Sequence, residues 1–318
     1  MNHLKKALSL LLICLILFGA SGCAKAPSAP VSPAANASPA PGAEFQADAR
    51  VSYLGPAGTY TEEAARFFFR SAAAFLPEST VDEAIADLVE GRADYAVIPQ
   101  ENTIGGAVTN YVDALIGQEG VSVVGEVILP ISQTLMAVPG AALSDIKTVC
   151  SHAQGIKQSE AWRAEHLPDA VTEEMGSTAA AASFVAQQQD KSVAAIAAPA
   201  AAELYELEVL AENVQITDAN KTRFYVLSAA PLTGLLTHAV FVADCGADRL
   251  DDIIVEIRDA GLELVTLHDR PEGSALGRYH YIIEVVSDGG ISAQQLDRVC
   301  ALEEVRLLGS FDAVEKGA

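Results

Sequence analysis

The sequence predicts a two-lobed α/β body followed by a small α+β domain, and two patterns along the chain support this. Between residues 51 and 228, short apolar runs typical of β-strands alternate with helical segments. This βαβα order implies right-handed crossovers and largely parallel sheets. From residue 237 onward the order becomes βαββαβ, which is that of a ferredoxin-like domain. With 318 residues, half of them apolar, the chain is long enough for two or three domains.

The first 22 residues have the order of a bacterial secretion signal. Lys5 and Lys6 precede an apolar run over residues 7–18, and small residues lead into Cys23. That run, about a dozen residues long, is too short to span a bilayer comfortably. The stretch resembles a lipobox, so we predict that residues 1–22 are a lipoprotein signal peptide and that Cys23 is lipidated. A plain signal peptide and an uncleaved anchor are the alternatives.

Residues 23–50 are rich in alanine and proline and show no helix or strand period. We predict that they form an extended tether. The protein would then be exported, anchored by its lipid to a bacterial membrane, and held on the periplasmic or outer side of that membrane.

The charge balance excludes some classes of partner. The chain has 20 basic and 42 acidic residues, a formal net charge of −22. Residues 1–22 hold two of the lysines and no acid, so their removal would make the net charge −24. Such a charge argues against nucleic acid and against docking on anionic lipid by charge. A small anionic substrate would need local hydrogen-bond donors.

The cysteines of the folded part give no sign of a metal site. Cys150, Cys245 and Cys300 are widely spaced, and no histidine or acidic cluster stands near them at ligand spacing. We expect buried thiols, with neither a disulfide nor zinc.

The α/β body begins with a strand over 51–54 and a Gly-rich turn over 55–61. Thr61 is placed to cap a helix over 62–70, because two acidic residues follow it at the positive end of the helix dipole. The further elements expected in the body are a helix over 80–90, a strand over 95–99, a helix over 108–116, two strands within 121–136 where the chain crosses between lobes, a strand over 148–150 followed by a helix, a helix over 179–188, and strands over 193–197 and 224–227.

Small polar residues gather where these elements end. Ligands of α/β proteins bind at such ends, and helix N-termini bind anions. At one junction His152 is either a general base or a cap that orients its loop. Two lobes around a cleft are also the architecture of a solute-binding protein. The five junctions are residues 55–61, 100–106, 151–155, 176–178 and 220–224.

Together these clusters resemble the successive motifs of the prephenate dehydratase family, in its order and spacing, over residues 51–228. The motifs are Leu54-Gly55-Pro56-Ala57-Gly58-Thr59-Tyr60, Pro99-Gln100-Glu101-Asn102 with Gly105 and Gly106, Ser151-His152-Ala153-Gln154, Ser177-Thr178-Ala179-Ala180 and Thr222-Arg223-Phe224. The resemblance implies two lobes like those of a type II periplasmic binding protein. It also implies the conversion of prephenate to phenylpyruvate, water and carbon dioxide, a step of phenylalanine biosynthesis, without a cofactor.

The resemblance also assigns roles to residues. Thr222 would be catalytic, giving a polarised hydrogen bond to the departing hydroxide. Arg223 would clamp a carboxylate or brace its loop, and Phe224 would be core or a platform for the ring. The residues that carry over as substrate-binding or orienting are Glu101, Asn102, Ser151, Gln154, Gln158, Ser177 and Thr178, together with Arg223 and Phe224.

Residues 237–312 resemble an ACT domain, a regulatory module that binds phenylalanine at a dimer interface. We therefore expect a homodimer and a possible phenylalanine effector. Two motifs are altered, because the chain has Asp248-Arg249-Leu250 and His268-Asp269-Arg270-Pro271 where the family has Gly-Ala-Leu and Glu-Ser-Arg-Pro. Asp248 could instead cap a helix. The candidate effector residues are Leu250, Asp269, Arg270 and Pro271.

Two other readings of the α/β body remain. An arogenate dehydratase would need an acidic or carbonyl partner for the substrate's ammonium group. A catalytically silent lipoprotein that binds an aromatic acid would need no proton donor, and Thr222 with Asn220 and Arg223 beside it argues against that.

Overall fold

The computed structural model describes residues 48–70 and 74–317. The predicted signal peptide, Cys23 and nearly all of the tether lie outside the described residues. The chain divides into two units, Met1–Ala35 and Asn36–Ala318, and every described residue belongs to the second. Within the described part, no helix combines the length and the apolar character needed to cross a membrane.

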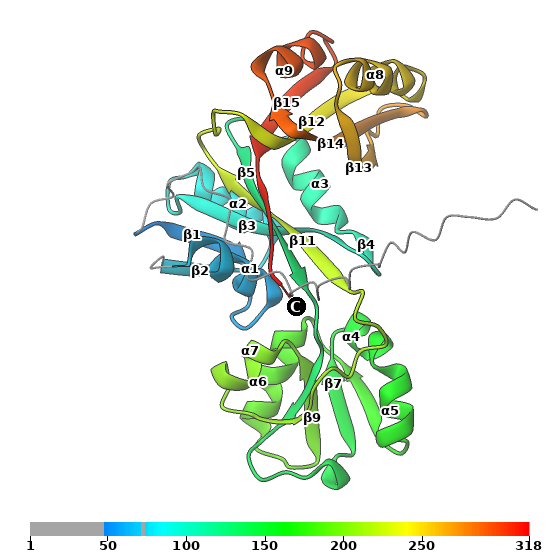
Figure 1. The fold of residues 1–318 in the computed structure, drawn as a ribbon. Coiled ribbons are helices and arrows are strands. Elements are labelled where there is room, and N and C mark those ends of the chain that lie inside the picture. The colour runs from blue at the N-terminus through cyan, green and yellow to red at the C-terminus, as the bar shows by residue number, and fades with distance from the viewer. Residues whose placement is uncertain (1–47, 71–73, 318) are drawn as a thin grey trace, which may run out of the picture. The chain divides into compact units, whose positions relative to one another are not determined.

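The first lobe is a mixed sheet flanked by helices (Figure 1). Its strands lie in the order β2-β1-β3-β11-β5, and all run in one direction except β11. Helix α1 packs its apolar side on one face of this sheet, while α2 and α3 pack on the other. The elements are β1 Arg50–Leu54, α1 Tyr60–Phe69, β2 Ala74–Glu78, α2 Val81–Val89, β3 Tyr95–Asn102, β4 Gly106–Ala107, α3 Thr109–Ile116, β5 Ser122–Pro130 and β11 Lys221–Ser228.

The second lobe repeats this plan. Its strand order is β8-β7-β9-β6-β10, with β6 alone running against the others. Small residues dominate its core, so that α6 and α7 sit close to the sheet. The elements are β6 Thr134–Ala137, η1 Leu143–Asp145, β7 Thr148–Ser151, α4 Ala153–Gln158, α5 Glu160–His166, β8 Val171–Glu174, α6 Thr178–Gln188, β9 Val193–Ala197, α7 Pro199–Leu204 and β10 Glu208–Ala211.

In each lobe, the antiparallel strand is the first strand that the chain forms after it crosses from the other lobe. The chain leaves the first lobe after β5 and enters the second as β6, and it returns from β10 as β11. This is the strand order of the type II periplasmic-binding-protein fold, and the predicted two-lobed α/β class is confirmed. The ends of the parallel strands in both lobes point toward the crossing, where ligands bind in folds of this kind.

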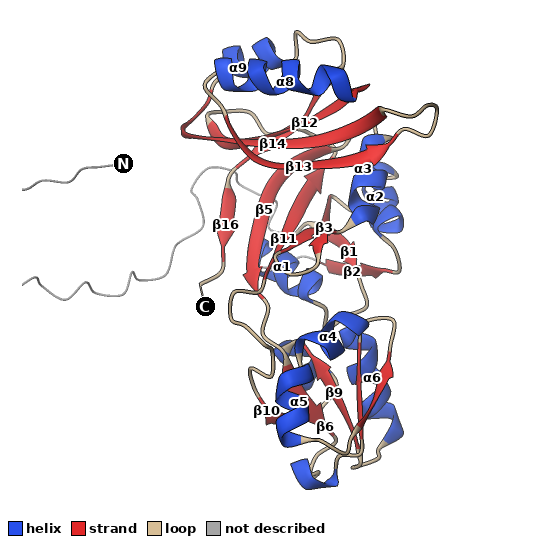
Figure 2. Cartoon of the chain, turned by 90° about the vertical axis from the view of Figure 1, so that its right-hand side faces the viewer, coloured by secondary structure: helices blue, strands red, loops and turns tan. Residues whose placement is uncertain are grey.

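The C-terminal residues form a four-stranded antiparallel sheet in the order β13-β14-β12-β15. Helices α8 and α9 cover one face of it (Figure 2). The predicted βαββαβ order and ferredoxin-like class are confirmed. The elements are β12 Leu236–Gly246, α8 Ala247–Asp259, β13 Glu263–Pro271, β14 Arg278–Ile291, α9 Ala293–Val299 and β15 Val305–Phe311.

The C-terminal sheet is continuous with that of the first lobe. β15 pairs in parallel with β5 through Gly309 and Val123, and a last strand, β16 (Ala313–Glu315), then runs along β5. A Cβ atom on Gly309 would lie only 2.1 Å from the carbonyl oxygen of Val123. The glycine therefore permits this close approach, which the sequence did not reveal.

The predicted cap of α1 is wrong, and so is the cap that was considered for α8. Thr59, not Thr61, caps α1, because Gly58 with a φ of +84° ends the turn earlier and the Thr59 hydroxyl accepts from the N–H of Glu62. Gly246 precedes α8 as its N-cap, and Asp248 lies inside the first turn.

Several short edge elements were not predicted. β2 contains Pro77, and all four residues of β8, Val171–Glu174, are exposed. Neither strand shows the apolar alternation by which a half-buried strand is recognised. The other unpredicted elements are β4, η1, α7, β10 and β16. The single helix expected after β7 is two helices, α4 and α5, which are separated at Ser159.

Candidate active site

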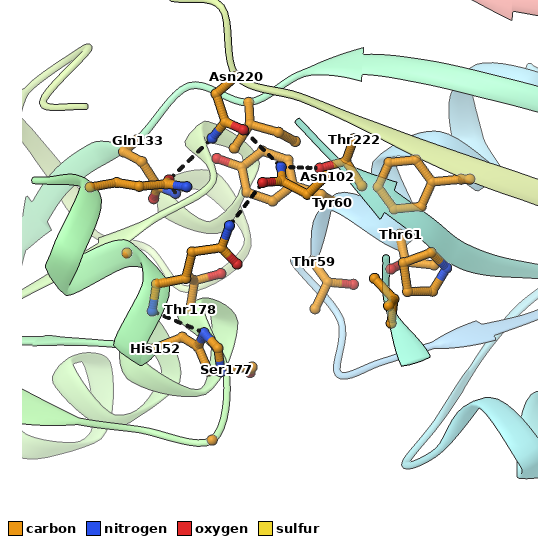
Figure 3. A pocket seen from close by; sticks show the side chains of 18 residues that line it. Thr59, Tyr60, Thr61, Asn102, Gln133, His152, Ser177, Thr178, Asn220 and Thr222 are labelled. Atoms are coloured by element: carbon orange, nitrogen blue, oxygen red, sulfur yellow. Dashed lines mark hydrogen bonds between the residues drawn. The ribbon is translucent and has the colours of Figure 1, made fainter. Parts of the chain in front are cut away.

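A pocket of about 270 Å³ lies where the two lobes face each other (Figure 3). The first lobe lines it from α1, β3 and β11, and the second from α4 and the start of α6. Its lining residues are Thr59, Tyr60, Thr61, Pro99, Asn102, Val108, Ile131, Gln133, His152, Gln154, Gly155, Gln158, Gly176, Ser177, Thr178, Asn220, Thr222 and Phe224.

A bulge in β3 decides which side chains face this pocket. Opposite β11, Glu101 pairs with Arg223 but Pro99 pairs with Phe224, so Gln100 is an extra residue in the ladder. Side chains of a regular strand alternate, and Pro99 and Asn102 would then face opposite sides. The bulge lets both line the pocket, and it leaves Gln100 and Glu101 outside the lining.

The bulge brings Asn102 against Thr222. The Thr222 hydroxyl accepts a hydrogen bond of 2.9 Å from Asn102 Nδ2, and Thr222 is only 9% exposed. Because this bond uses the oxygen as acceptor, the hydroxyl hydrogen remains available to a bound molecule. The arrangement can donate one hydrogen bond, aimed into the pocket, to a developing negative charge.

Asn102 is held from several sides. Its Nδ2 also donates to Asn220 Oδ1 at 2.7 Å, and its Oδ1 accepts from Gln154 Nε2 at 2.9 Å. The backbone N–H groups of Ile104 and Gly105 donate to the same oxygen. Asn102 therefore links the loop after β3, the start of β11 and the second lobe.

The second lobe contributes amides and a helix end. Asn220 Nδ2 donates to Gln158 Oε1 at 3.1 Å, joining the lobes a second time. The Ser177 hydroxyl caps α6 by accepting from the N–H of Ala180 at 3.0 Å, and Thr178 begins the helix. The first N–H groups of such a helix have no partner within it and favour an anion.

Gln133 lines the pocket, although the sequence analysis did not select it. It is 3% exposed, and neither its Oε1 nor the Nε2 of Gln158 has a hydrogen-bond partner. Buried amide atoms are normally satisfied, so polar groups of a ligand are expected there. The available signal was a glutamine between two apolar strands at the predicted crossing between lobes.

The described side chains that line the pocket are polar or apolar, without fixed charges. Among the described residues that line it there is no Asp, Glu, Lys or Arg. Negative groups of a ligand would be held by hydroxyls, amides and helix N–H groups, as expected from the strongly acidic composition. In addition, the described residues include no group of three His, Cys, Asp or Glu side chains that could hold a metal ion.

His152 acts as a cap. Its Nδ1 accepts from the N–H of Gln154 at 3.3 Å, at the start of α4. In the neutral ring this places the proton on Nε2. Of the two roles considered for His152, the structure supports the one that orients the loop.

Three predicted binding residues lie outside the pocket lining. The Ser151 hydroxyl is fully buried and donates to the carbonyl of Ile196 at 2.7 Å. Arg223 is held by Glu126, with Glu101 3.6 Å away, so it braces β11. The predicted binding residues that do line the pocket are Asn102, Gln154, Gln158, Ser177, Thr178 and Phe224, together with the predicted catalytic Thr222.

The Gly-rich turn over 55–61 offers fewer free donors than expected. The N–H of Gly58 donates to Glu62 Oε2 at 2.6 Å, and that of Gly55 to the carbonyl of Glu78 at 2.8 Å. The turn supplies Thr59, Tyr60 and Thr61 to the pocket instead.

The candidate effector residues lie on the C-terminal domain. Leu250 packs in α8 against the domain core, and Asp269 and Pro271 belong to β13. Arg270 forms two hydrogen bonds, of 2.5 and 2.8 Å, with the carboxylate of Asp113 on α3. Its guanidinium thus joins the C-terminal domain to the first lobe.

Comparison with known proteins agrees with this geometry. The sequence model of the prephenate dehydratase family matches residues 51–231, more than half of the chain. The chain belongs to the prephenate dehydratase family. The prephenate dehydratase of Amycolatopsis methanolica is 34% identical to it, over 82% of this chain and 88% of that protein. The matched part of this chain is longer than residues 51–231, so the similarity extends beyond the region that the family model covers.

Two solved structures are similar to this prephenate dehydratase family member over most of its length. Prephenate dehydratase from Arthrobacter aurescens, in complex with L-Phe, has a TM-score of 0.74 and 30% identity, covering 83% of this chain and 90% of that one. GqqA, described as a novel type of quorum quenching acylase, also has a TM-score of 0.74, with 27% identity, covering 83% of this chain and 98% of that one.

Proposed function

We propose that the protein is a prephenate dehydratase, which converts prephenate to phenylpyruvate, water and carbon dioxide. Family membership supports the reaction, and the observation that carries it is the Thr222 hydroxyl, held by Asn102 with its hydrogen free for a ligand. The reaction is a carbon–oxygen lyase step that needs no cofactor.

The chemistry needs few groups. Loss of the ring carboxylate as carbon dioxide and of the C4 hydroxyl creates an aromatic ring, which provides the driving force. The electron pair of the breaking carbon–carbon bond enters the ring, the C–O bond breaks as hydroxide leaves, and the hydroxide takes up a proton from solvent to become water. Thr222 stabilises the departing oxygen by a hydrogen bond, while neutral donors such as the first N–H groups of α6 hold the carboxylates.

Thr222→Val tests this role, because valine keeps the shape and removes the hydroxyl. We expect kcat for prephenate to fall by about 100-fold or more, the usual effect of removing one donor to a developing charge, with KM changed little. Thr172→Val, on the exposed strand β8, is the matched control. Near-normal turnover by Thr222→Val would disprove the assignment.

The pocket favours prephenate over arogenate. Arogenate carries an ammonium group where prephenate carries a ketone, and no carboxylate among the described lining residues is there to receive it. The unpaired amide carbonyl of Gln133 can accept a hydrogen bond from that ammonium group, but a neutral oxygen attracts a cation less strongly than a carboxylate does. Assays with both substrates under the same conditions decide the point, and higher kcat/KM for arogenate would contradict the proposal.

The similarity to an acylase does not extend to the hydrogen bonds of the pocket. An acyl-transfer nucleophile needs a base within hydrogen-bond reach. Among the described residues, Thr222 is bonded to Asn102, Ser177 to its own helix, and His152 Nδ1 to a backbone N–H. Within the described lining, no hydroxyl–histidine pair is hydrogen-bonded.

We also propose that residues 237–312 are an ACT-like regulatory domain that forms a homodimer and binds phenylalanine. Its ferredoxin-like fold and the L-Phe bound to the Arthrobacter neighbour support this. The Arg270–Asp113 pair would have to open if Arg270 contacts the effector. Titration with L-Phe, read by calorimetry and by turnover, tests the effector.

Finally, we propose that the protein is exported and lipidated at Cys23. The ordered signal over residues 1–22 and the proline-rich tether support this. Labelling cells with a radioactive fatty acid should mark the wild type, and Cys23→Ser should remain unlabelled. A labelled Cys23→Ser protein would contradict the proposal.

A further inference from the structure

A buried ionic cluster lies behind the catalytic strand, apart from the pocket lining. We call Arg223, Glu126, Glu284, Tyr225 and Gln100 the Arg223 cluster. The side chains of Glu126 and Glu284 are fully buried, and that of Arg223 is 16% exposed. The residues come from β11, β5, β14 and β3, so the cluster joins the C-terminal domain to the first lobe.

The contacts within the cluster are specific. Glu126 accepts from Arg223 Nε at 2.5 Å and from Nη2 at 2.8 Å, and Glu284 Oε1 also accepts from Nη2. The Tyr225 hydroxyl donates to Glu284 Oε2 at 2.6 Å, and Gln100 Nε2 donates to that hydroxyl at 2.8 Å. Glu284 thus contacts both Arg223 and Tyr225 on β11.

The place of these contacts in β11 gives them a consequence for catalysis. Arg223 directly follows Thr222, and the ladder with β3 is interrupted between Arg223 and Phe224. At a bulge the regular pairing is locally disrupted, so β11 loses part of its backbone ladder on the β3 side next to Thr222, while its ladder with β5 continues. The side-chain bonds of Arg223 and Tyr225 add to the β5 ladder in holding β11 there. Glu284 supplies two of them from a domain that lends no residue to the pocket.

We propose that Glu284 is a positioning residue for the dehydratase reaction: by holding Arg223 and Tyr225 on the far side of β11, it fixes the Thr222 hydroxyl against Asn102 and the substrate. This inference rests on the proposed function. It means that the C-terminal domain is part of the active-site support even without an effector.

The ionisation of Glu284 gives the test a pH dependence of kcat, which a purely structural role would not produce. Burial, with Glu126 nearby, raises the pKa of Glu284 to about 7. Below that pH the carboxyl is mostly protonated, and glutamine is its near isostere. Above it, ionised Glu284 forms a second ion pair with Arg223. The charged and titratable groups that face the cluster are Arg223 and Tyr225 from β11, Glu126 from β5, Glu101 from β3, Tyr111 from α3, His238 from β12 and His268 from β13.

The test compares Glu284→Ala and Glu284→Gln in the full chain at pH 6 and pH 8. We expect Glu284→Ala to lower kcat by about 10- to 100-fold, the effect of displacing a catalytic group by about 1 Å, with KM changed little. Glu284→Gln should keep most of the activity at pH 6, and the ratio of wild-type to Glu284→Gln kcat should rise toward pH 8.

The matched control is Arg306→Gln. Arg306 is another partly buried residue of the C-terminal domain that contacts the first lobe, donating to the carbonyls of Leu115 and Ile116 at the end of α3. It lies outside the Arg223 cluster, so kcat should stay near normal below the unfolding temperature. An equal loss in Arg306→Gln and Glu284→Ala, or a kcat ratio for Glu284→Gln that is independent of pH, would overturn the proposal.

A crystal structure of Glu284→Ala separates this proposal from the proposed function. We expect the Thr222–Asn102 hydrogen bond to lengthen or break. If the wild type fails to turn over prephenate, the proposed function falls, and the position of Thr222 in the variant still decides the inference. An unmoved Thr222 would overturn it.

Discussion

At the scale of residues, the active site depends on which atom of each amide faces which neighbour. Asn102 gives its Nδ2 to Thr222 and its Oδ1 to Gln154. Because Thr222 accepts from Asn102, it is left as a donor toward the substrate. An acceptor in place of Nδ2 would instead take the threonine hydrogen.

Asn102→Asp makes this replacement. The Thr222 hydroxyl would donate to the new carboxylate, and the added negative charge would repel a dianionic substrate. We expect kcat to fall by about 100-fold and KM to rise. The urea midpoint of unfolding should also fall, because the new carboxylate would face Asn220 Oδ1, which in the wild type accepts from Asn102 Nδ2 at 2.7 Å. The control is Asn110→Asp, at an exposed position of α3. If kcat of Asn102→Asp is unchanged, Asn102 does not set the direction of the threonine hydrogen bond.

Sequence motifs predicted much of this site because its residues stand at strand and helix ends. Asn102, Gln154, Ser177 and Thr222 were all found in that way. Gln133 was missed, because a glutamine between two apolar strands is a weak signal by itself and its role depends on how the lobes meet. For Arg223 the motif left two roles open, a carboxylate clamp or a brace, and its partners Glu126 and Glu284 could not be found because they are distant in sequence and stand within apolar strands.

At the scale of elements, short apolar runs predicted the buried strands and failed for the edges. The strands β1, β3, β7 and β9 were recognised, whereas β2 and β8 were not. The junction of β15 with β5 could not be predicted either. It depends on Gly309, which looks in the sequence like any other glycine of a strand.

Gly309→Ala tests that junction. A Cβ atom there would lie 2.1 Å from the oxygen of Val123, so the backbones must separate. We expect the free energy of unfolding to fall by about 2 kcal/mol or more, as in overpacked cores. Gly289→Ala in β14 is the control, since its Cβ would meet no atom within 4 Å and we expect a change below about 1 kcal/mol. Equal urea midpoints for the two variants would show that β15 and β5 can separate without lowering the free energy of unfolding.

At the scale of the whole molecule, charge sets how the substrate arrives. The net charge of the sequence is −22, whereas the described lining of the pocket holds no Asp, Glu, Lys or Arg. The local donors can bind a dianion once it is inside. They do little to offset the repulsion that the dianion meets on approach, because the field of the whole protein acts at longer range.

Salt should therefore raise kcat/KM for prephenate. The distance over which charges are screened shrinks from about 30 Å at 0.01 M to about 10 Å at 0.1 M ionic strength, which weakens the long-range repulsion more than the short hydrogen bonds in the pocket. We expect kcat/KM to increase several-fold over this range, with kcat nearly constant. The measurement is a series of initial rates in sodium chloride, repeated in potassium chloride to exclude a specific ion effect. A decrease of kcat/KM with salt would mean instead that a positive local potential attracts the substrate. The uncharged side chains of the lining would then not account for the electrostatic potential at the pocket entrance.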